Sequence, residues 1–180
     1  MTHLLAEQKR TILDCVNRPS LNDLTQNLLR KSMLVYGVRS GIYVPLIQQA
    51  EGIQWYKDKI GPSDFQRLRL IPSQDWVALS LGTLRLSVAA QHLEQDRALI
   101  TQFYAGHVKT VDSYMQTLLS FPLTIIAIAT DLNGEFTVID GVKHSVATYL
   151  AVFVRKTITI FPDIDIYVGL CNKKTQLHAP

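Results

Sequence analysis

The 180-residue sequence is poor in cysteine and has no block of charge of one sign. Its two cysteines, Cys15 and Cys171, lie near opposite ends, and no Cys/His spacing typical of a zinc site accompanies them. We therefore expect two reduced thiols and neither a disulfide framework nor a structural metal site. The 18 Lys and Arg residues against 15 Asp and Glu give a net charge of +3. Because these charges are scattered, the chain lacks the basic footprint of a nucleic-acid-binding surface.

Long apolar runs, internal repeats and low-complexity tracts are also missing. The first residues reach Glu7, Lys9 and Arg10 too soon for a signal peptide, and the apolar runs at 123–129 and 146–154 are too short to cross a bilayer. We expect a cytoplasmic protein with no membrane partner. A content of 47% hydrophobic and 18% charged residues is typical of a folded globular chain.

The N-terminal third has the pattern of helices. Two apolar stripes at helical spacing are separated by Arg18-Pro19, and a third apolar segment around residues 53–56 ends at Gly61-Pro62. We expect a helical extension over residues 1–61. Its stripes should pack on the sheet domain or on a partner chain, because apolar faces of that area do not stay exposed. A homo-oligomer formed through these helices is the corresponding expectation for partners.

Beyond residue 61 the pattern alternates between strands and helices. A tight hairpin is expected at Asn133-Gly134, because both residues tolerate positive φ. The fold class is α+β: a helical N-terminal part, then a small mixed sheet with helices over residues 62–170, then a polar tail over residues 171–180. Strands are expected at 67–72, 123–129, 135–139, 157–160 and 164–168, and helices at 86–104, 108–118 and 142–154, with a break at Gly106-His107.

The candidate site is the strand–turn–helix element around Asp140-Gly141-Val142-Lys143-His144. Backbone N–H groups of a first helical turn have no partner within the helix, and the helix dipole adds positive potential there. Gly141 lacks a Cβ, so a ligand can approach its backbone, and Lys143 adds a mobile positive charge. His144 titrates near neutral pH, Ser145 carries a hydroxyl, and Asp140 can cap the helix or accept a bond from a ligand hydroxyl.

The same residues also suit a purely structural role. Asp-Gly ahead of a helix is an ordinary turn with an N-cap, and single lysine, histidine and serine residues at such places are commonly surface groups.

The order of elements around the turn favours the functional interpretation. A strand ends at Leu70-Ile71-Pro72, helices end near Ser120, a Pro-Leu-hydrophobic strand starts at Pro122, and a returning strand ends in Asp140-Gly141 ahead of a helix. This order resembles the ParB/sulfiredoxin-like superfamily over residues 67–169. The resemblance implies binding of a nucleotide (ATP, ADP or CTP), with Mg²⁺, by Gly141, Val142, Lys143, His144 and Ser145.

The chain departs from the family pattern at three positions of the turn. Val142 stands where sulfiredoxins have their cysteine, so sulfiredoxin chemistry is not expected. Lys143 stands where the family usually has histidine, and His144 where it has arginine, so the bidentate grip of arginine on phosphate is lost. Lys143 restores the positive charge but not the two parallel N–H donors of a guanidinium group.

The leading functional hypothesis is nucleotide-dependent phosphoryl transfer to a small hydroxylated metabolite, with His144, Asp140 and Glu94 as catalytic candidates. Asp96 and Asp75 are further carboxylates for the base that a kinase needs. The alternative is a non-catalytic nucleotide- or protein-binding module of the same fold. A DNA-associated ParB-like protein is disfavoured by the weak charge and by the lack of a helix-turn-helix pattern after the turn.

Overall fold

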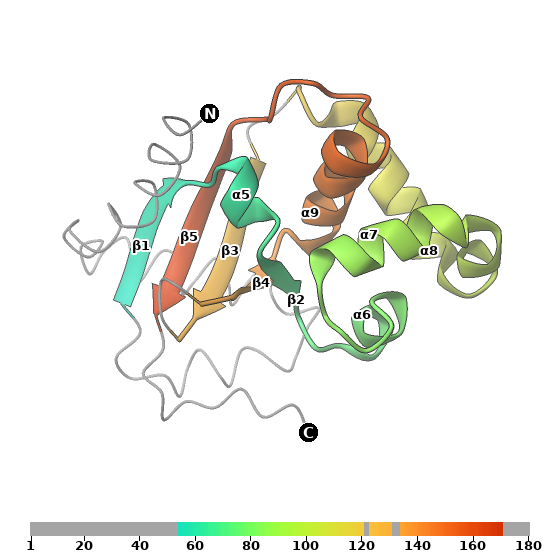
Figure 1. The fold of residues 1–180 in the computed structure, drawn as a ribbon, viewed down its shortest axis with the longest axis horizontal. Coiled ribbons are helices and arrows are strands. Elements are labelled where there is room, and N and C mark those ends of the chain that lie inside the picture. Colours follow the sequence, from blue (N-terminus) through green and yellow to red (C-terminus); the bar gives the residue numbers. More distant parts are fainter. Residues whose placement is uncertain (1–53, 121–122, 131–133, 171–180) are drawn as a thin grey trace.

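The computed structural model describes residues 54–120, 123–130 and 134–170, and its strands and helices form one mixed sheet with helices beside it (Figure 1). The strands are β1 (Gln54–Lys59), β2 (Leu68–Leu70), β3 (Leu123–Ala129), β4 (Phe136–Asp140) and β5 (Ile164–Leu170). The helices are α5 (Pro62–Phe65), α6 (Gln74–Leu79), α7 (Leu86–Gln95), α8 (Arg97–Thr117), α9 (Val142–Tyr149) and the π-helical η2 (Leu150–Val154). The α+β class is therefore confirmed for this part of the chain.

The five strands form a sheet in the order β1-β5-β3-β4-β2. β3 pairs with β4 antiparallel, with Ile126 opposite Asp140, so the predicted pairing of these two strands is confirmed. Asn133, in the expected turn between them, lies outside the described residues. β5 runs parallel to β3, and β2 runs parallel to β4. Parallel pairs need a crossover between the strands, and α6, α7 and α8 lie between β2 and β3 in the sequence.

The core forms where the helices meet the sheet. All residues of β3 except Thr124 are buried, as its isoleucine-rich run predicts for a central strand. α9 faces the sheet with Val146, and Leu150 follows on the same side; both are fully buried. Helices α6 to α9 group together on one side of the strands (Figure 1). This packing holds α9, the helix that follows the candidate turn, in place against the sheet.

The expected helical extension does not reach residue 61, because residues 54–59 form the edge strand β1. Its partner is β5, with Lys57 opposite Tyr167 and Lys59 opposite Asp165. Lys57 and Lys59, two residues apart and thus on one face of the strand, both form ion pairs with Asp165, at 3.2 and 2.7 Å. Within the described residues, the sheet therefore begins at residue 54. The apolar stripes expected before it, and the polar tail expected after residue 170, lie outside the described residues.

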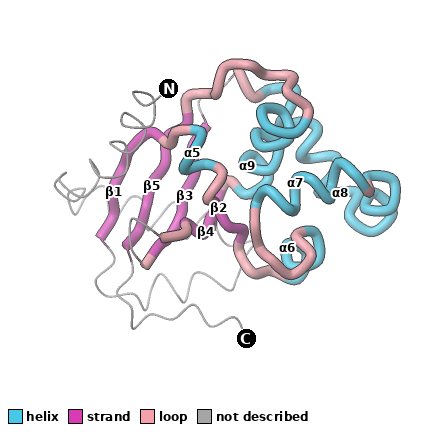
Figure 2. The backbone as a smooth tube through the Cα atoms, viewed as in Figure 1, coloured by secondary structure: helices cyan, strands magenta, loops and turns pink. Residues whose placement is uncertain are grey.

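Two further expectations on secondary structure are wrong, a strand at 157–160 and one helix over 86–104, and a third is displaced by two residues. Residues 157–160 form no strand but belong to the loop between η2 and β5 (Figure 2). The backbone N–H groups of Thr157 and Ile158 donate to the Ala151 carbonyl and so close the end of the helix, and the Ile160 side chain is 80% exposed. The helix expected over residues 86–104 is divided at Asp96 between α7 and α8. The break expected at Gly106-His107 lies two residues earlier, where two helical segments of α8 meet at a kink at Tyr104 (φ −130°, ψ 36°).

Candidate functional site

The turn between β4 and α9 is built on a glycine that no other residue can replace without strain. Gly141 is the N-cap of α9 and has φ +81°, in the left-handed region. A Cβ added there would lie 3.0 Å from the backbone oxygen of Thr124 on β3. The space beside Gly141 is thus filled by the neighbouring strand, so this residue is glycine because of packing. The expectation that the missing Cβ admits a ligand is not supported.

The first turn of α9 has backbone donors that the described part of the chain does not satisfy. The first intrahelical bond runs from the Ser145 N–H to the Gly141 carbonyl, at 2.8 Å. No side chain caps the helix and no acidic residue lies in its first turn. The exposed Asp140 carboxylate instead accepts the N–H of Gly141, at 2.9 Å. The N–H groups of Val142, Lys143 and His144 therefore have no acceptor among the described residues, which suits an anion at this position.

Lys143 is the cation of this turn. Its side chain is half-buried, and no ion pair joins it to a carboxylate in residues 54–120, 123–130 or 134–170. An ammonium group in this position adds a full positive charge to the partial charge at the helix start.

His144 lies against Tyr114 of α8 instead of extending into solvent. The two rings are stacked, with centroids 3.4 Å apart and an interplanar angle of 17°. Burial lowers the pKa of His144 below its usual value, while the nearby Asp140 carboxylate opposes that shift. The imidazole is therefore neutral at pH 7, which makes it a proton acceptor rather than a cation for phosphate.

The side chains of two other predicted ligand residues are not available to a ligand. The Ser145 side chain is fully buried, and its hydroxyl donates to the Gly141 carbonyl at 2.9 Å, so it does not contribute to an open site. Val142 is buried in the core and leaves only its backbone N–H for a ligand. The structure thus places the residues of the turn together but reduces the available side chains to Asp140, Lys143 and His144.

None of the three acidic residues considered as a base belongs to the turn, because each is paired elsewhere. Glu94 accepts from Nε and from a terminal nitrogen of Arg155, the residue after η2, at 2.9 and 2.5 Å. Asp96 pairs with His92 at 3.6 Å, and Asp75 with Nε2 of His107 at 2.8 Å. The geometry gives Glu94 a structural role between α7 and the end of η2.

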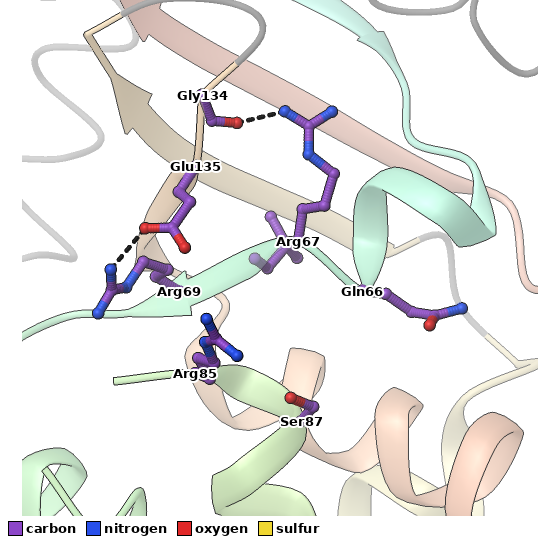
Figure 3. Close-up of a pocket in the computed structure, with 8 residues that line it drawn as sticks. Gln66, Arg67, Arg69, Arg85, Ser87, Gly134 and Glu135 are labelled. Carbon is purple, nitrogen blue, oxygen red and sulfur yellow. Dashed lines mark hydrogen bonds and ion pairs between the residues drawn. The ribbon is translucent and has the colours of Figure 1, made fainter. Parts of the chain in front are cut away.

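Sequence reasoning missed a cavity at the opposite end of β4. It has a volume of about 380 Å³, and Figure 3 shows the residues around it. The strand β2 and the residue before it contribute Arg67 and Arg69, the start of α7 contributes Arg85 and Ser87, and the chain ahead of β4 contributes Glu135. The alternation of arginine and leucine over residues 67–70 was a signal of one arginine-bearing strand face. The approach of α7 to that strand could not be seen in the sequence.

No metal ligand cluster accompanies the turn: in the part of the chain that the structure describes, no group of three or more His, Cys, Asp or Glu residues is placed to hold a metal ion. Mg²⁺ in nucleotide sites is commonly held by one or two carboxylates together with the phosphates, and Asp140 is the carboxylate that this turn offers. None of the described helices has the length and apolar character that spanning a membrane requires.

No protein-family model matches the chain, and no curated protein or solved structure is significantly similar to it.

Proposed function

We propose that the protein binds the phosphate groups of a nucleotide at the start of α9. The observation that carries this proposal is the set of three backbone N–H groups, those of Val142, Lys143 and His144, that no described residue accepts. Lys143 adds a positive charge to this turn, and no acidic side chain lies in the first turn of α9, while the Asp140 carboxylate just ahead of it accepts the Gly141 N–H. Helix N-termini of this kind bind phosphate in many unrelated folds.

The resemblance to the ParB/sulfiredoxin-like superfamily supports a nucleotide as the source of the phosphate. It covers the strand–turn–helix element and the order of strands around it. Lys143 serves as a point cation in place of the arginine of the family pattern, so the phosphate is held mainly by backbone donors and by one ammonium group. Selectivity for ATP, ADP or CTP rests on contacts beyond this turn.

Of the two expected functions, non-catalytic nucleotide binding is the one that the geometry supports best. Glu94, the carboxylate expected to act in catalysis, is committed to Arg155. The Ser145 hydroxyl is committed to the Gly141 carbonyl. A phosphotransferase needs a group that accepts the proton of the acceptor hydroxyl, and neither of these residues is available for that role.

Phosphoryl transfer to a small hydroxylated metabolite is the second candidate, and one observation favours it. His144 is held neutral by burial and lies within electrostatic reach of Asp140. A neutral imidazole beside a carboxylate is a competent general base. In this version His144 would accept the proton of the hydroxyl, and Asp140 would be the residue that holds Mg²⁺, whose charge would offset that of the phosphates.

A thermal-shift screen with ATP, ADP, CTP and GTP, each with and without Mg²⁺, tests the binding proposal. A nucleotide at 100 times its dissociation constant should stabilise the protein by about 2.7 kcal/mol. Unchanged melting temperatures with all four at millimolar concentration would reject it. Incubation of the nucleotide that binds with serine, glycerol and similar hydroxylated compounds then separates the two functions, since only the enzyme forms a phosphorylated product.

A further inference from the structure

The arginine-lined cavity lies at the end of the sheet opposite to the start of α9. Glu135 precedes β4 and Gly141 follows it, so six residue steps separate the cavity from the candidate turn. At about 3.3 Å per residue this is roughly 20 Å along the strand. One phosphate group cannot reach both places, and the cavity is considered independently of the proposed nucleotide site.

Positive charge exceeds negative charge around this cavity. Among the described residues, three arginines and one carboxylate, that of Glu135, line it. Arg67 pairs with Asp64 at 3.1 Å, and its guanidinium also donates to the Gly134 carbonyl. Arg69 pairs with Glu135 and donates to the Thr83 carbonyl.

Arg85 has no such partner in the described part of the chain. Its side chain is exposed, and no carboxylate or carbonyl of the described residues accepts from its guanidinium. Its backbone pairs with Arg69 of β2 through an isolated antiparallel bridge, so two guanidinium-bearing residues are adjacent at the sheet edge. Arginine forks placed together in this way match the oxygen geometry of phosphate and carboxylate groups.

Arg85 also stands at the N-terminus of α7, where a positive charge is unusual. Arg85 is the N-cap of α7, makes no side-chain cap, and is followed by a first turn without an acidic residue. A cation at a helix N-terminus opposes the helix dipole and is unfavourable by itself. The neighbouring helix α6 has the usual arrangement, with Ser73 accepting from the Trp76 N–H and Asp75 in the first turn. Among the described residues, no acidic side chain in the first turn of α7 offsets the charge of Arg85, and the carboxylate in the cavity, Glu135, pairs with Arg69.

We propose that this cavity binds a small molecule carrying a phosphate monoester. The groups that bind it are the guanidinium groups of Arg85 and Arg69 and the backbone N–H groups of the first turn of α7, around Ser87. A phosphate dianion has three terminal oxygens for donors that come from two separate elements, whereas a carboxylate has two. A volume of about 380 Å³ lies within the usual range of roughly 300–1,000 Å³ for small-molecule sites. Glu135 lies beside Arg69 and competes with the ligand for its guanidinium.

An NMR titration with methyl phosphate, the simplest phosphate monoester, tests the proposal on the full chain. The Lys143→Ala variant serves as the background, so that the start of α9 does not contribute to binding. The backbone amides of Leu86, Ser87 and Val88 should shift and saturate, and acetate at the same ionic strength should bind more weakly. Arg85→Gln should raise the dissociation constant about tenfold or more, the effect of losing a charge-assisted hydrogen bond. Arg85→Lys should retain only part of the affinity, because it keeps the charge without the fork.

Two further variants make the result specific. Lys109→Gln removes the same charge from an exposed residue of α8 that does not line the cavity, and it should leave the dissociation constant unchanged. Glu135→Gln removes the competing carboxylate and should tighten binding several-fold. Amides 86–88 that do not shift, or an Arg85→Gln variant that melts like the wild type and binds methyl phosphate equally well, would overturn the proposal. Neither result would bear on nucleotide binding at α9, which depends on Lys143.

Discussion

The imidazole ring of His144 lies face to face with the phenol ring of Tyr114, with ring centroids 3.4 Å apart. This contact joins the first turn of α9 to the second half of α8 and keeps the candidate turn in place against the helical layer. It also explains why the pKa of His144 is lowered, since the stacked ring is withdrawn from water. The stack is thus a structural feature with a direct effect on the chemistry of the turn.

Removing the stack should destabilise the fold. Tyr114→Ala should lower the free energy of unfolding by about 1–3 kcal/mol, because it deletes both an aromatic pair and buried apolar area. Tyr114→Phe, which keeps the ring, is the matched control and should stay within about 0.5 kcal/mol of the wild type. Urea denaturation of the three proteins measures both values. Equal stability of Tyr114→Ala and the wild type would mean that the stack contributes nothing.

The lowered pKa of His144 predicts a pH dependence of stability. The unfolded chain binds a proton at this residue below pH of about 6.5, whereas the folded chain resists protonation down to a lower pH. The free energy of unfolding should therefore fall as the pH decreases below about 6.5, and this loss should be complete below the folded-state pKa. His144→Phe keeps an aromatic ring on Tyr114 but cannot titrate, so the difference between wild type and variant should change over this window. A difference that is constant from pH 7.5 to pH 5 would contradict the assignment.

Gly141 should be intolerant of a side chain. Gly141→Ala places a Cβ at φ +81° and 3.0 Å from the Thr124 oxygen, and should cost about 2 kcal/mol or more, from left-handed strain and the contact together. Gly106→Ala is the control, because Gly106 is within α8 with nothing within 4 Å of an added Cβ. That change should stabilise the protein by about 0.5–1 kcal/mol. Thermal denaturation would refute the account if both variants moved in the same direction.

Glu94 should contribute to the stability of the fold and not to nucleotide binding or catalysis. Glu94→Gln weakens the pair with Arg155 and should reduce the free energy of unfolding by about 1 kcal/mol, since both side chains are about one-third exposed (32% and 29%). Nucleotide affinity, and turnover if there is any, should be unchanged. Asp96→Asn, which affects a longer and more exposed contact with His92, is the control and should change stability less. A selective loss of turnover in Glu94→Gln without a loss of stability would restore the catalytic assignment.

Some of these features could be predicted because their signals are local. The isoleucine-rich run of β3, the pairing of β3 with β4, and a glycine between β4 and α9 follow from residues close together in the sequence. Residues 157–160 show the limit of such signals. Their β-branched residues suit a strand, yet the N–H groups of Thr157 and Ile158 cap a helix instead of pairing in the sheet.

Features that join distant segments could not be predicted. The Glu94–Arg155 pair spans 61 residues, and the arginine-lined cavity combines residues from 66 to 135. A carboxylate that looks like a free base in the sequence becomes an ion-pair partner only when α7 meets the end of η2.

The most direct test of the nucleotide site is isothermal titration of wild type and Lys143→Ala with ATP, ADP and CTP in the presence of Mg²⁺. The account predicts binding by the wild type and a loss of about 1–3 kcal/mol in the variant, the range for a hydrogen bond to a charged group. Lys109→Ala, which removes an exposed lysine of α8, should bind like the wild type. A wild type that binds none of the three nucleotides at millimolar concentration, or a Lys143→Ala variant that binds as tightly as the wild type, would contradict it.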